Sequence, residues 1–172
     1  MAQVGQAAAR AAIAAWFSPQ NVAGLGWTYR STPNRVPGVN YKQSQNNGSG
    51  AVLIVHLPGA KEVRIAMGGP TSGEKFAKYS VALEIRYKSV KTSAMNAQDD
   101  LDTLIDTLLA RIRADRTFGT TPLTYSGKTS TIWQAGEGAA GIEWGQLKAV
   151  LNNGVVEIPA WIKFECWIYI AG

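Results

Sequence analysis

Two short glycine-containing runs have residue types that could bind phosphate groups. Residues 136–141 (GEGAAG) fit the spacing G-x-G-x-x-G of dinucleotide-binding loops, which need a strand before them and a helix that opens at them. Asn153-Gly154 predicts an antiparallel hairpin soon afterwards, which favours a flexible glycine loop instead. Residues 126–129 (SGKT) match the end of a phosphate-binding loop, but Pro122 stands where the first glycine belongs. The sequence therefore predicts no nucleotide cofactor.

The titratable residues favour structural roles over catalysis or metal binding. His56, the only histidine, has no Cys, Asp or Glu at ligand spacing, and it does not define a Ser/His/Asp set. An acidic set and a basic set lie at opposite ends of one predicted helix, where the helix dipole and solvation explain them. They are Asp99, Asp100, Asp102 and Asp106, followed by Arg111, Arg113 and Arg116. We therefore expect a protein that is not an enzyme, with no catalytic residue, no cofactor and no metal ligand.

Composition points to one globular domain over residues 1–172. The chain is 46% hydrophobic with a net charge of +5, and it has no run of Lys and Arg that would force nucleic-acid binding. The alanine-rich residues 7–17 lack a basic leader and contain Arg10, and no stretch approaches the roughly 20 apolar residues of a membrane helix. We therefore expect neither membrane association nor a signal peptide. The single cysteine, Cys166, alternates with apolar residues, which indicates a buried side chain and a reducing origin.

The elements that position these residues are predicted from periodicity. Residues 79–88 alternate strictly between apolar and polar, as a half-buried strand does, and a long amphipathic helix follows from an Asn96 cap toward Gly119. Residues 2–17 predict an N-terminal helix that stops at Ser18-Pro19. A short strand over 27–30 and a hairpin of 51–57 with 61–67, turning at Pro58-Gly59, complete the first half. This order predicts an α+β fold, a mainly antiparallel sheet with both helices packed on it.

The C-terminal part predicts a second hairpin, preceded by a polar, turn-rich stretch from 119 to 130 and a short strand over 131–134. Asn153-Gly154 joins strands 146–151 and 155–170, with Leu151 opposite Val156 and Leu147 opposite Ala160. Pro159 lacks an N–H, so the hairpin should end or bulge there, and residues 161–170 should pair with 79–88. Trp161 and Trp167 then share the less apolar face. Either a helix, with the N-terminal helix as candidate, or another subunit covers them.

The stretch from 32 to 50 has a loop composition of Pro, Asn, Gln and hydroxyl residues. Loops beyond about 12–15 residues are commonly functional or disordered. Two interpretations stay open: a flexible surface loop, and an arm that orders on a neighbouring subunit. A glycine-rich loop at 68–73 leads into the long strand over 79–88.

In the order of these segments and in their residue types, the chain resembles the tail terminator proteins of long-tailed bacteriophages. The resemblance rests on residues 79–87 (YSVALEIRY), 97–105 (AQDDLDTLI), 111–116 (RIRADR), the loop 134–138 (QAGEG) and the strand 157–164 (EIPAWIKF). It implies a virion structural protein, assembled in the host cytoplasm as a homohexameric ring. That ring caps the tail tube protein, stops tube polymerisation and offers a surface to the head–tail connector, while DNA passes through it without sequence-specific binding. Another neck or minor tail component of similar fold, and then a nucleic-acid-binding module, are the alternatives.

No functional residue carries over from the family by motif, because surfaces do its work. The two loops and the exposed aromatic residues are the predicted contacts with other subunits or rings. These candidates are Asn34, Arg35, Tyr41, Lys42, Thr71, Glu74, Lys75, Trp161 and Trp167.

Overall fold

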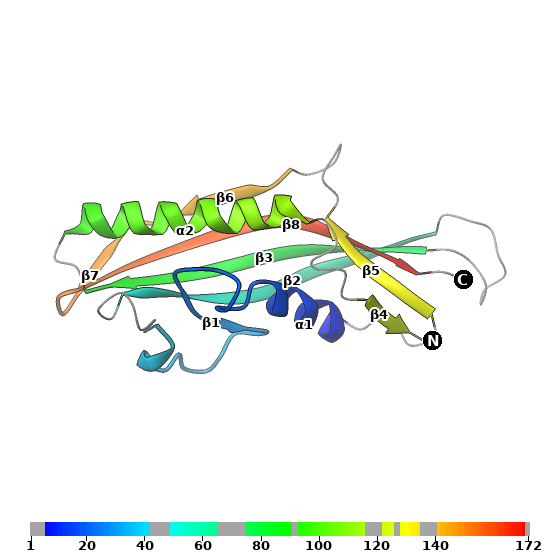
Figure 1. Cartoon of the computed structure of the whole chain (residues 1–172), viewed down its shortest axis with the longest axis horizontal. Helices are drawn as coiled ribbons and strands as arrows, with labels where there is room; N and C mark the ends of the chain where they lie inside the picture. Colours follow the sequence, from blue (N-terminus) through cyan, green and yellow to red (C-terminus); the bar gives the residue numbers. More distant parts are fainter. Residues whose placement is uncertain are drawn as a thin grey trace.

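The computed structural model describes residues 6–41, 49–64, 75–90, 93–115, 122–125, 128–134 and 141–170. These form two α-helices, one short 3₁₀ helix and a sheet of eight strands, which confirms the mixed α+β class (Figure 1). The elements are α1 (Gln6–Trp16), β1 (Leu25–Tyr29), η1 (Gly38–Tyr41), β2 (Gly50–Arg64), β3 (Lys75–Ser89), α2 (Ala94–Ala114), β4 (Pro122–Tyr125), β5 (Lys128–Gln134), β6 (Glu143–Gln146), β7 (Val150–Asn152) and β8 (Val155–Ile170).

The sheet follows the order β1-β2-β3-β8-β5-β4, and β6 and β7 pair with the same edge of β8 that β5 uses. Only β1 and β2 run parallel among these pairs. At the centre, β3 and β8 are paired from Lys75 opposite Ile170 to Ser89 opposite Val156. The predicted pairing of 79–88 with the C-terminal strand is therefore confirmed, because the two longest alternating segments match in length and in pattern.

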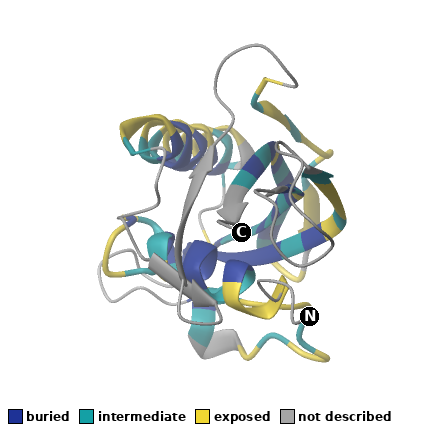
Figure 2. Cartoon of the chain, turned by 90° about the vertical axis from the view of Figure 1, so that its right-hand side faces the viewer, coloured by how far each residue is buried: buried dark blue, intermediate teal, exposed yellow. Residues whose placement is uncertain are grey.

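Both helices pack on the same face of this sheet. The apolar positions of β2, β3 and β8 form one buried cluster with residues of α1 such as Ile13 and residues of α2 such as Leu108. In Figure 2 the buried sides of the two helices turn toward the strands. The expectation that the N-terminal helix covers Trp161 and Trp167 is therefore wrong. Its small alanine-rich face fits against β2 instead, where Phe17 is fully buried.

The predicted hairpin at Pro58-Gly59 is also wrong. β2 is one strand that pairs with β3 throughout, with a register shift between His56 and Gly59. His56 lies opposite Ala82 and Gly59 opposite Ser80, so β2 has one more residue than β3 between these two pairs. A proline cannot donate to the ladder, and a bulge accommodates it without reversing the chain.

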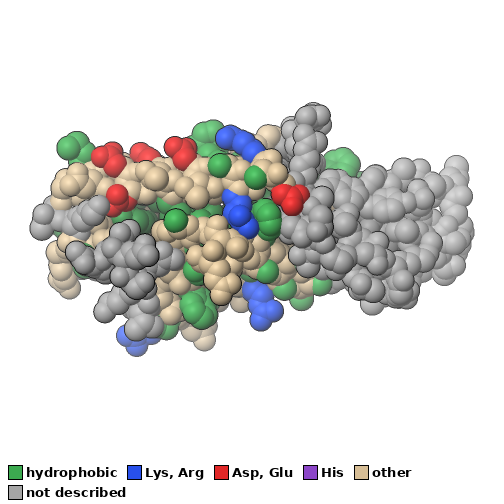
Figure 3. Space-filling model, viewed as in Figure 1, with side chains coloured by type: hydrophobic (Ala, Val, Ile, Leu, Met, Phe, Trp, Pro, Cys, Tyr) green, Lys and Arg blue, Asp and Glu red, His purple; other side chains and the backbone are tan. Residues whose placement is uncertain are grey.

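The helix α2 begins earlier than predicted. Its N-cap is Ser93, whose hydroxyl accepts the N–H of Asn96 at 3.4 Å, so Asn96 lies inside the helix. The helix ends before Asp115, and Gly119 lies outside the described residues. Its buried side is Ala97, Leu101, Leu104, Ile105, Leu108, Leu109 and Ile112. Acidic side chains gather over its first half and basic ones near its end (Figure 3). Arg111 and Arg113 are in the last turn, where the dipole favours cations, but the first turn holds no acidic residue because the helix begins at Ala94, so the dipole explanation predicted for the acidic set is wrong.

The C-terminal hairpin has the predicted register, with Leu151 opposite Val156. Asn153 and Gly154 both have positive φ, of 50° and 77°, as a tight two-residue hairpin turn needs. The predicted interruption of the hairpin at Pro159 is confirmed. The pairing of β7 with β8 extends from the turn only as far as Val150, and the N–H of Leu147 donates to the Pro159 carbonyl at 2.8 Å. Beyond this bulge Gln146 lies opposite Ala160, one residue away from the predicted Leu147.

One further strand was missed in the segment predicted to be turns. Residues 122–125 form β4, which pairs with β5 from Tyr125 opposite Lys128. The short strand predicted over 131–134 is confirmed as the end of β5. Thr129 and Thr131 alternate in the sequence, and threonine is common in strands. The polar composition of the segment had favoured turns over this strand signal. The glycine-rich residues 136–140 and 68–73 lie outside the described residues.

Candidate functional surface

The sheet face opposite the helices carries most of the described polar side chains of the long strands. We call it the outer face, and it includes His56, Lys78, Ala82, Glu84, Arg86, Lys88, Trp161, Lys163 and Trp167. Strand register places these residues in rows across the sheet. One row runs His56, Ala82, Lys163 and Glu143, and the next runs Ile54, Glu84, Trp161 and Gly145.

Glu84 takes part in two of the described ion pairs on this face. Its carboxylate accepts a hydrogen bond from Arg86 Nε at 2.6 Å and lies 2.8 Å from His56 Nε2. Burial is the largest single influence and raises the pKa of Glu84. The hydrogen bonds and charges of Arg86 and His56 together outweigh it, so the net pKa is lowered. Glu84 is therefore held in its ionised form by partners of its own, which favours a structural role over a role in proton transfer.

The two tryptophans predicted as contacts are each stacked with a lysine of their own subunit. The Lys78 ammonium lies 3.7 Å from the centre of the Trp167 ring, and the Lys163 ammonium lies 4.5 Å from that of Trp161. Gly145, opposite Trp161, has no side chain to obstruct the indole, and an added Cβ would lie 2.8 Å from it. Both rings are only half-exposed. Sequence reasoning identified the residues but missed the cation–π pairs that hold them.

The first part of the predicted arm lies against its own subunit. Tyr41, in η1, is buried, and it packs with Val36 on Val52 and Ile54 in a second small cluster. Burial raises the pKa of the Tyr41 hydroxyl, although Lys88 and Arg86 act in the opposite direction. The Lys88 ammonium lies 4.7 Å from the Tyr41 ring centre and 2.7 Å from Glu157.

The other predicted contact residues are dispersed. Asn34 and Arg35 are exposed on the segment before η1. Lys42, Thr71 and Glu74 lie outside the described residues, and of Lys75 only the backbone, at the start of β3, is described. The structure does not bring these residues together with Trp161 and Trp167 into one described cluster.

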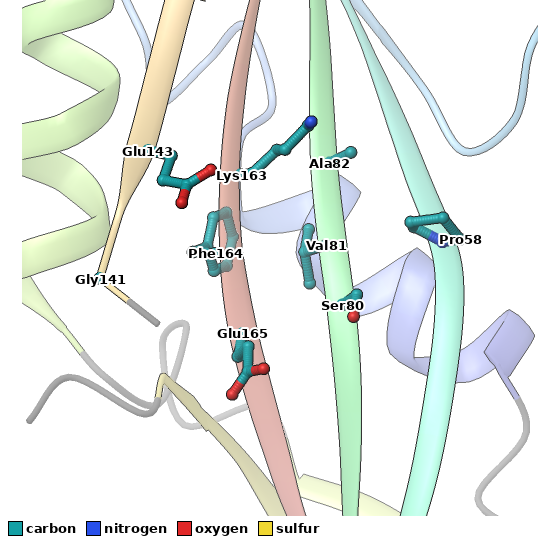
Figure 4. Close-up of a pocket in the computed structure, with 9 residues that line it drawn as sticks. All are labelled: Pro58, Ser80, Val81, Ala82, Gly141, Glu143, Lys163, Phe164 and Glu165. Carbon is teal, nitrogen blue, oxygen red and sulfur yellow. The ribbon is translucent and has the colours of Figure 1, made fainter. Parts of the chain in front are cut away.

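Three hollows lined by described residues reach the outer face. One of about 580 Å³ is lined by Arg10, Ser31, Thr32, Val55, His56, Leu57, Pro58, Ala82 and Lys163. A second, of about 460 Å³, lies between η1 and the ends of β3 and β8. The third, of about 270 Å³ (Figure 4), shares Pro58, Ala82 and Lys163 with the first. Ala82 lines both the first and the third hollow, where its short side chain leaves space between longer neighbours.

The edges of the sheet expose apolar side chains that sequence reasoning did not identify. The β6–β7 rim consists of Trp144, Leu147, Val150 and Leu151, which are 50%, 62%, 57% and 72% exposed. Val90 follows β3 and Met95 is in the first turn of α2, at the end of the molecule where Figure 1 places β7, and both are exposed. At the opposite edge, Trp27 of β1 is 50% exposed. Leu151 is paired with Val156, as the hairpin pattern predicted, and it is exposed.

Within the described residues, no group of three or more His, Cys, Asp and Glu side chains could hold a metal ion. None of the described helices is long and apolar enough to span a membrane. Cys166 is buried, and burial raises the pKa of its thiol well above the ordinary value. Comparison with known protein families gives no match, and no curated protein matches the sequence.

Proposed function

We propose that the chain is the subunit of a head-to-tail ring and, following its resemblance, the tail terminator of a long-tailed bacteriophage. The observation that carries the proposal is the pair of exposed apolar edges, the β6–β7 rim on one side of the sheet and Trp27 on the other. The four rim residues form an exposed cluster, which commonly marks a contact site, and Trp27 is the exposed apolar side chain at the other edge. Because the two edges differ, their association is heterologous, and such a contact repeats around a ring when the rotation closes.

In this proposal the sheet and the long amphipathic helix α2 form the rigid scaffold of each subunit. The ring holds six copies in the virion, caps the tail tube, stops its growth and offers one surface to the head–tail connector. The loops at 32–50 and 68–75 are the proposed contacts with the neighbouring rings. Each of these points extends the resemblance, and the exposed edges support only the ring itself.

The test uses two edge variants and native mass measurement. Leu151→Asp introduces a charge into the β6–β7 rim, and Trp27→Asp does the same at β1. Each variant alone should lose the ring, because one half of every contact is damaged. Mixed together they should form a 1:1 dimer, because each supplies the intact edge that the other lacks. Ala110→Asp, on the exposed side of α2, is the control and should keep the ring.

A ring that survives both edge variants would refute the assembly part of the proposal. So would wild-type protein that stays monomeric both alone and with purified tail tubes. The phage role has its own test: loss of the gene should give tails of uncontrolled length. Tails of normal length would contradict termination while leaving the ring intact as a finding.

A further inference from the structure

The hollow of about 580 Å³, which we call the Arg10 hollow, lies where β1 ends. The last residue of β1, Tyr29, lies opposite Ile54, so β2 from Val55 onward has no strand partner on that side among the described residues. α1 and the residues after β1 lie there instead, and the hollow of about 580 Å³ opens between them and the outer face. Its size falls within the range of about 300–1,000 Å³ that is typical of small-molecule sites.

The charges that line this hollow have one sign. Arg10 of α1 and Lys163 of β8 line it, with the hydroxyl-bearing Ser31 and Thr32 and with His56. No carboxylate is among its described lining residues. Of the carboxylates outside this lining set, Glu143 lies opposite Lys163 in the strand pairing, and Glu84 is already bonded to His56 and Arg86.

The geometry of the two cations favours a ligand between them. Figure 4 shows the Lys163 side chain extending from β8 toward β3 and away from Glu143. The Nε of Arg10 is buried and has no hydrogen-bond partner among the described residues. A buried guanidinium N–H without a partner is costly, and an anion that accepts its hydrogen bond would remove that cost.

We propose that the Arg10 hollow binds an oxyanion, a carboxylate or a phosphate, carried on a small apolar body. Arg10 and Lys163 supply the charge, and Ser31 and Thr32 supply hydroxyl donors at the rim. Val55, Leu57 and Pro58 form the apolar wall against which the body of the ligand packs. This site does not depend on the ring, because all of its residues come from one chain.

The experiment is a calorimetric titration of the full chain with four probes: phenyl phosphate, benzoate, inorganic phosphate and the uncharged phenol. The first two distinguish the phosphate from the carboxylate source. The third shows whether the apolar body contributes, and the fourth whether the charge is needed. We expect one or both aromatic anions to bind more tightly than inorganic phosphate, and phenol not to bind.

Three variants locate the site. Arg10→Met and Lys163→Met keep an apolar stem without the charge, and each should weaken binding about tenfold or more. Ala82→Leu keeps both charges and fills the hollow, and it should abolish binding. Arg35→Met removes an exposed charge outside the lining set and should leave affinity unchanged. Circular dichroism and the urea midpoint check that each variant is folded, and Arg10→Lys should restore part of the affinity.

Four results would overturn the proposal. They are no saturable binding of any anion up to about 10 mM, binding of phenol equal to that of benzoate, full affinity in folded Arg10→Met, and full affinity in folded Ala82→Leu.

Discussion

Replacing Gly26 by alanine should detach the η1 segment from the sheet. Gly26 lies in β1 at the register shift between Leu25 and Trp27, directly beneath η1. A Cβ there would overlap the carbonyl oxygen of Asn40 and lie 2.9 Å from its carbon. Both are backbone atoms, so no side-chain rotation relieves the clash. Either β1 or η1 must move.

The cost follows from what η1 holds in place. Detachment exposes Tyr41, and a buried aromatic side chain removes about 150–250 Å² from water, worth about 4–6 kcal/mol at about 25 cal/mol per Å². Full release of the four residues of η1 would regain backbone entropy of about 1–2 kcal/mol each, which is comparable with that loss, so the net cost cannot exceed the smaller of the two routes, detachment or local strain. We expect Gly26→Ala to lower the free energy of unfolding by about 1–3 kcal/mol, the usual range for overpacking.

Urea unfolding and hydrogen exchange measure the two parts of this effect. The amides of η1 should lose protection, and trypsin should cleave faster after the exposed Arg35. Gly59→Ala is the matched control, because its added Cβ would have only the Ser80 hydroxyl nearby, at 3.9 Å. It should change stability by less than about 0.5 kcal/mol. A Gly26→Ala protein with wild-type stability and wild-type protection of η1 would refute the reasoning.

Gly145→Ala should lower the free energy of unfolding by about 1–2 kcal/mol, because its Cβ would displace the Trp161 ring, and it should be neutral when Trp161 is already alanine. Gly141→Ala is the matched control, because its Cβ would meet nothing within 4 Å. Equal effects of Gly145→Ala with Trp161 present and absent, measured by urea unfolding, would refute this contact. The lowered pKa of Glu84 means that the folded state favours its ionised form, so its contribution is present above the ordinary pKa of 4.5 and is lost as pH falls through the lower folded value. Because Glu84 is a third exposed, Glu84→Gln should cost under about 1 kcal/mol at pH 7 and flatten the stability–pH curve below 4.5, whereas an unchanged acid limb would contradict the assignment. Ser93→Ala should cost about 1 kcal/mol by urea unfolding, and Ser93→Asp should not, because only alanine removes the cap of α2.

The central strands could be predicted because their signals are local. Strict alternation defined β3 and most of β8, and Asn153-Gly154 specified both the turn and its register. Pro159 indicated where β7 must stop, since a residue without an N–H cannot continue the ladder. The same reasoning failed at Pro58 because a proline next to glycine is compatible with both a turn and a bulge. Only the full-length pairing of β2 with β3 decides between them.

The candidate sites could not be predicted because they join residues that are distant in the chain. Arg10, His56 and Lys163 come from α1, β2 and β8, and only the sheet register aligns the last two across Ala82. The vacancy opposite Trp161 is likewise a property of Gly145 on another strand. The exposure of Leu151 depends on where α2 and the sheet end, and no pattern within the hairpin specifies that.

The apolar side chains proposed as contacts differ in how far the chain itself already buries and contacts them. Trp161 and Trp167 are half-buried and each is stacked with a lysine, so a partner would gain only the remaining exposed area and would have to preserve the cation contact. Leu151 and Trp27 are 72% and 50% exposed at opposite edges of the sheet. Full burial of such a side chain is worth about 1.5–3 kcal/mol. The free energy available for assembly therefore lies mainly at the edges, so the β6–β7 rim and β1 are stronger contact candidates than the two tryptophans of the outer face.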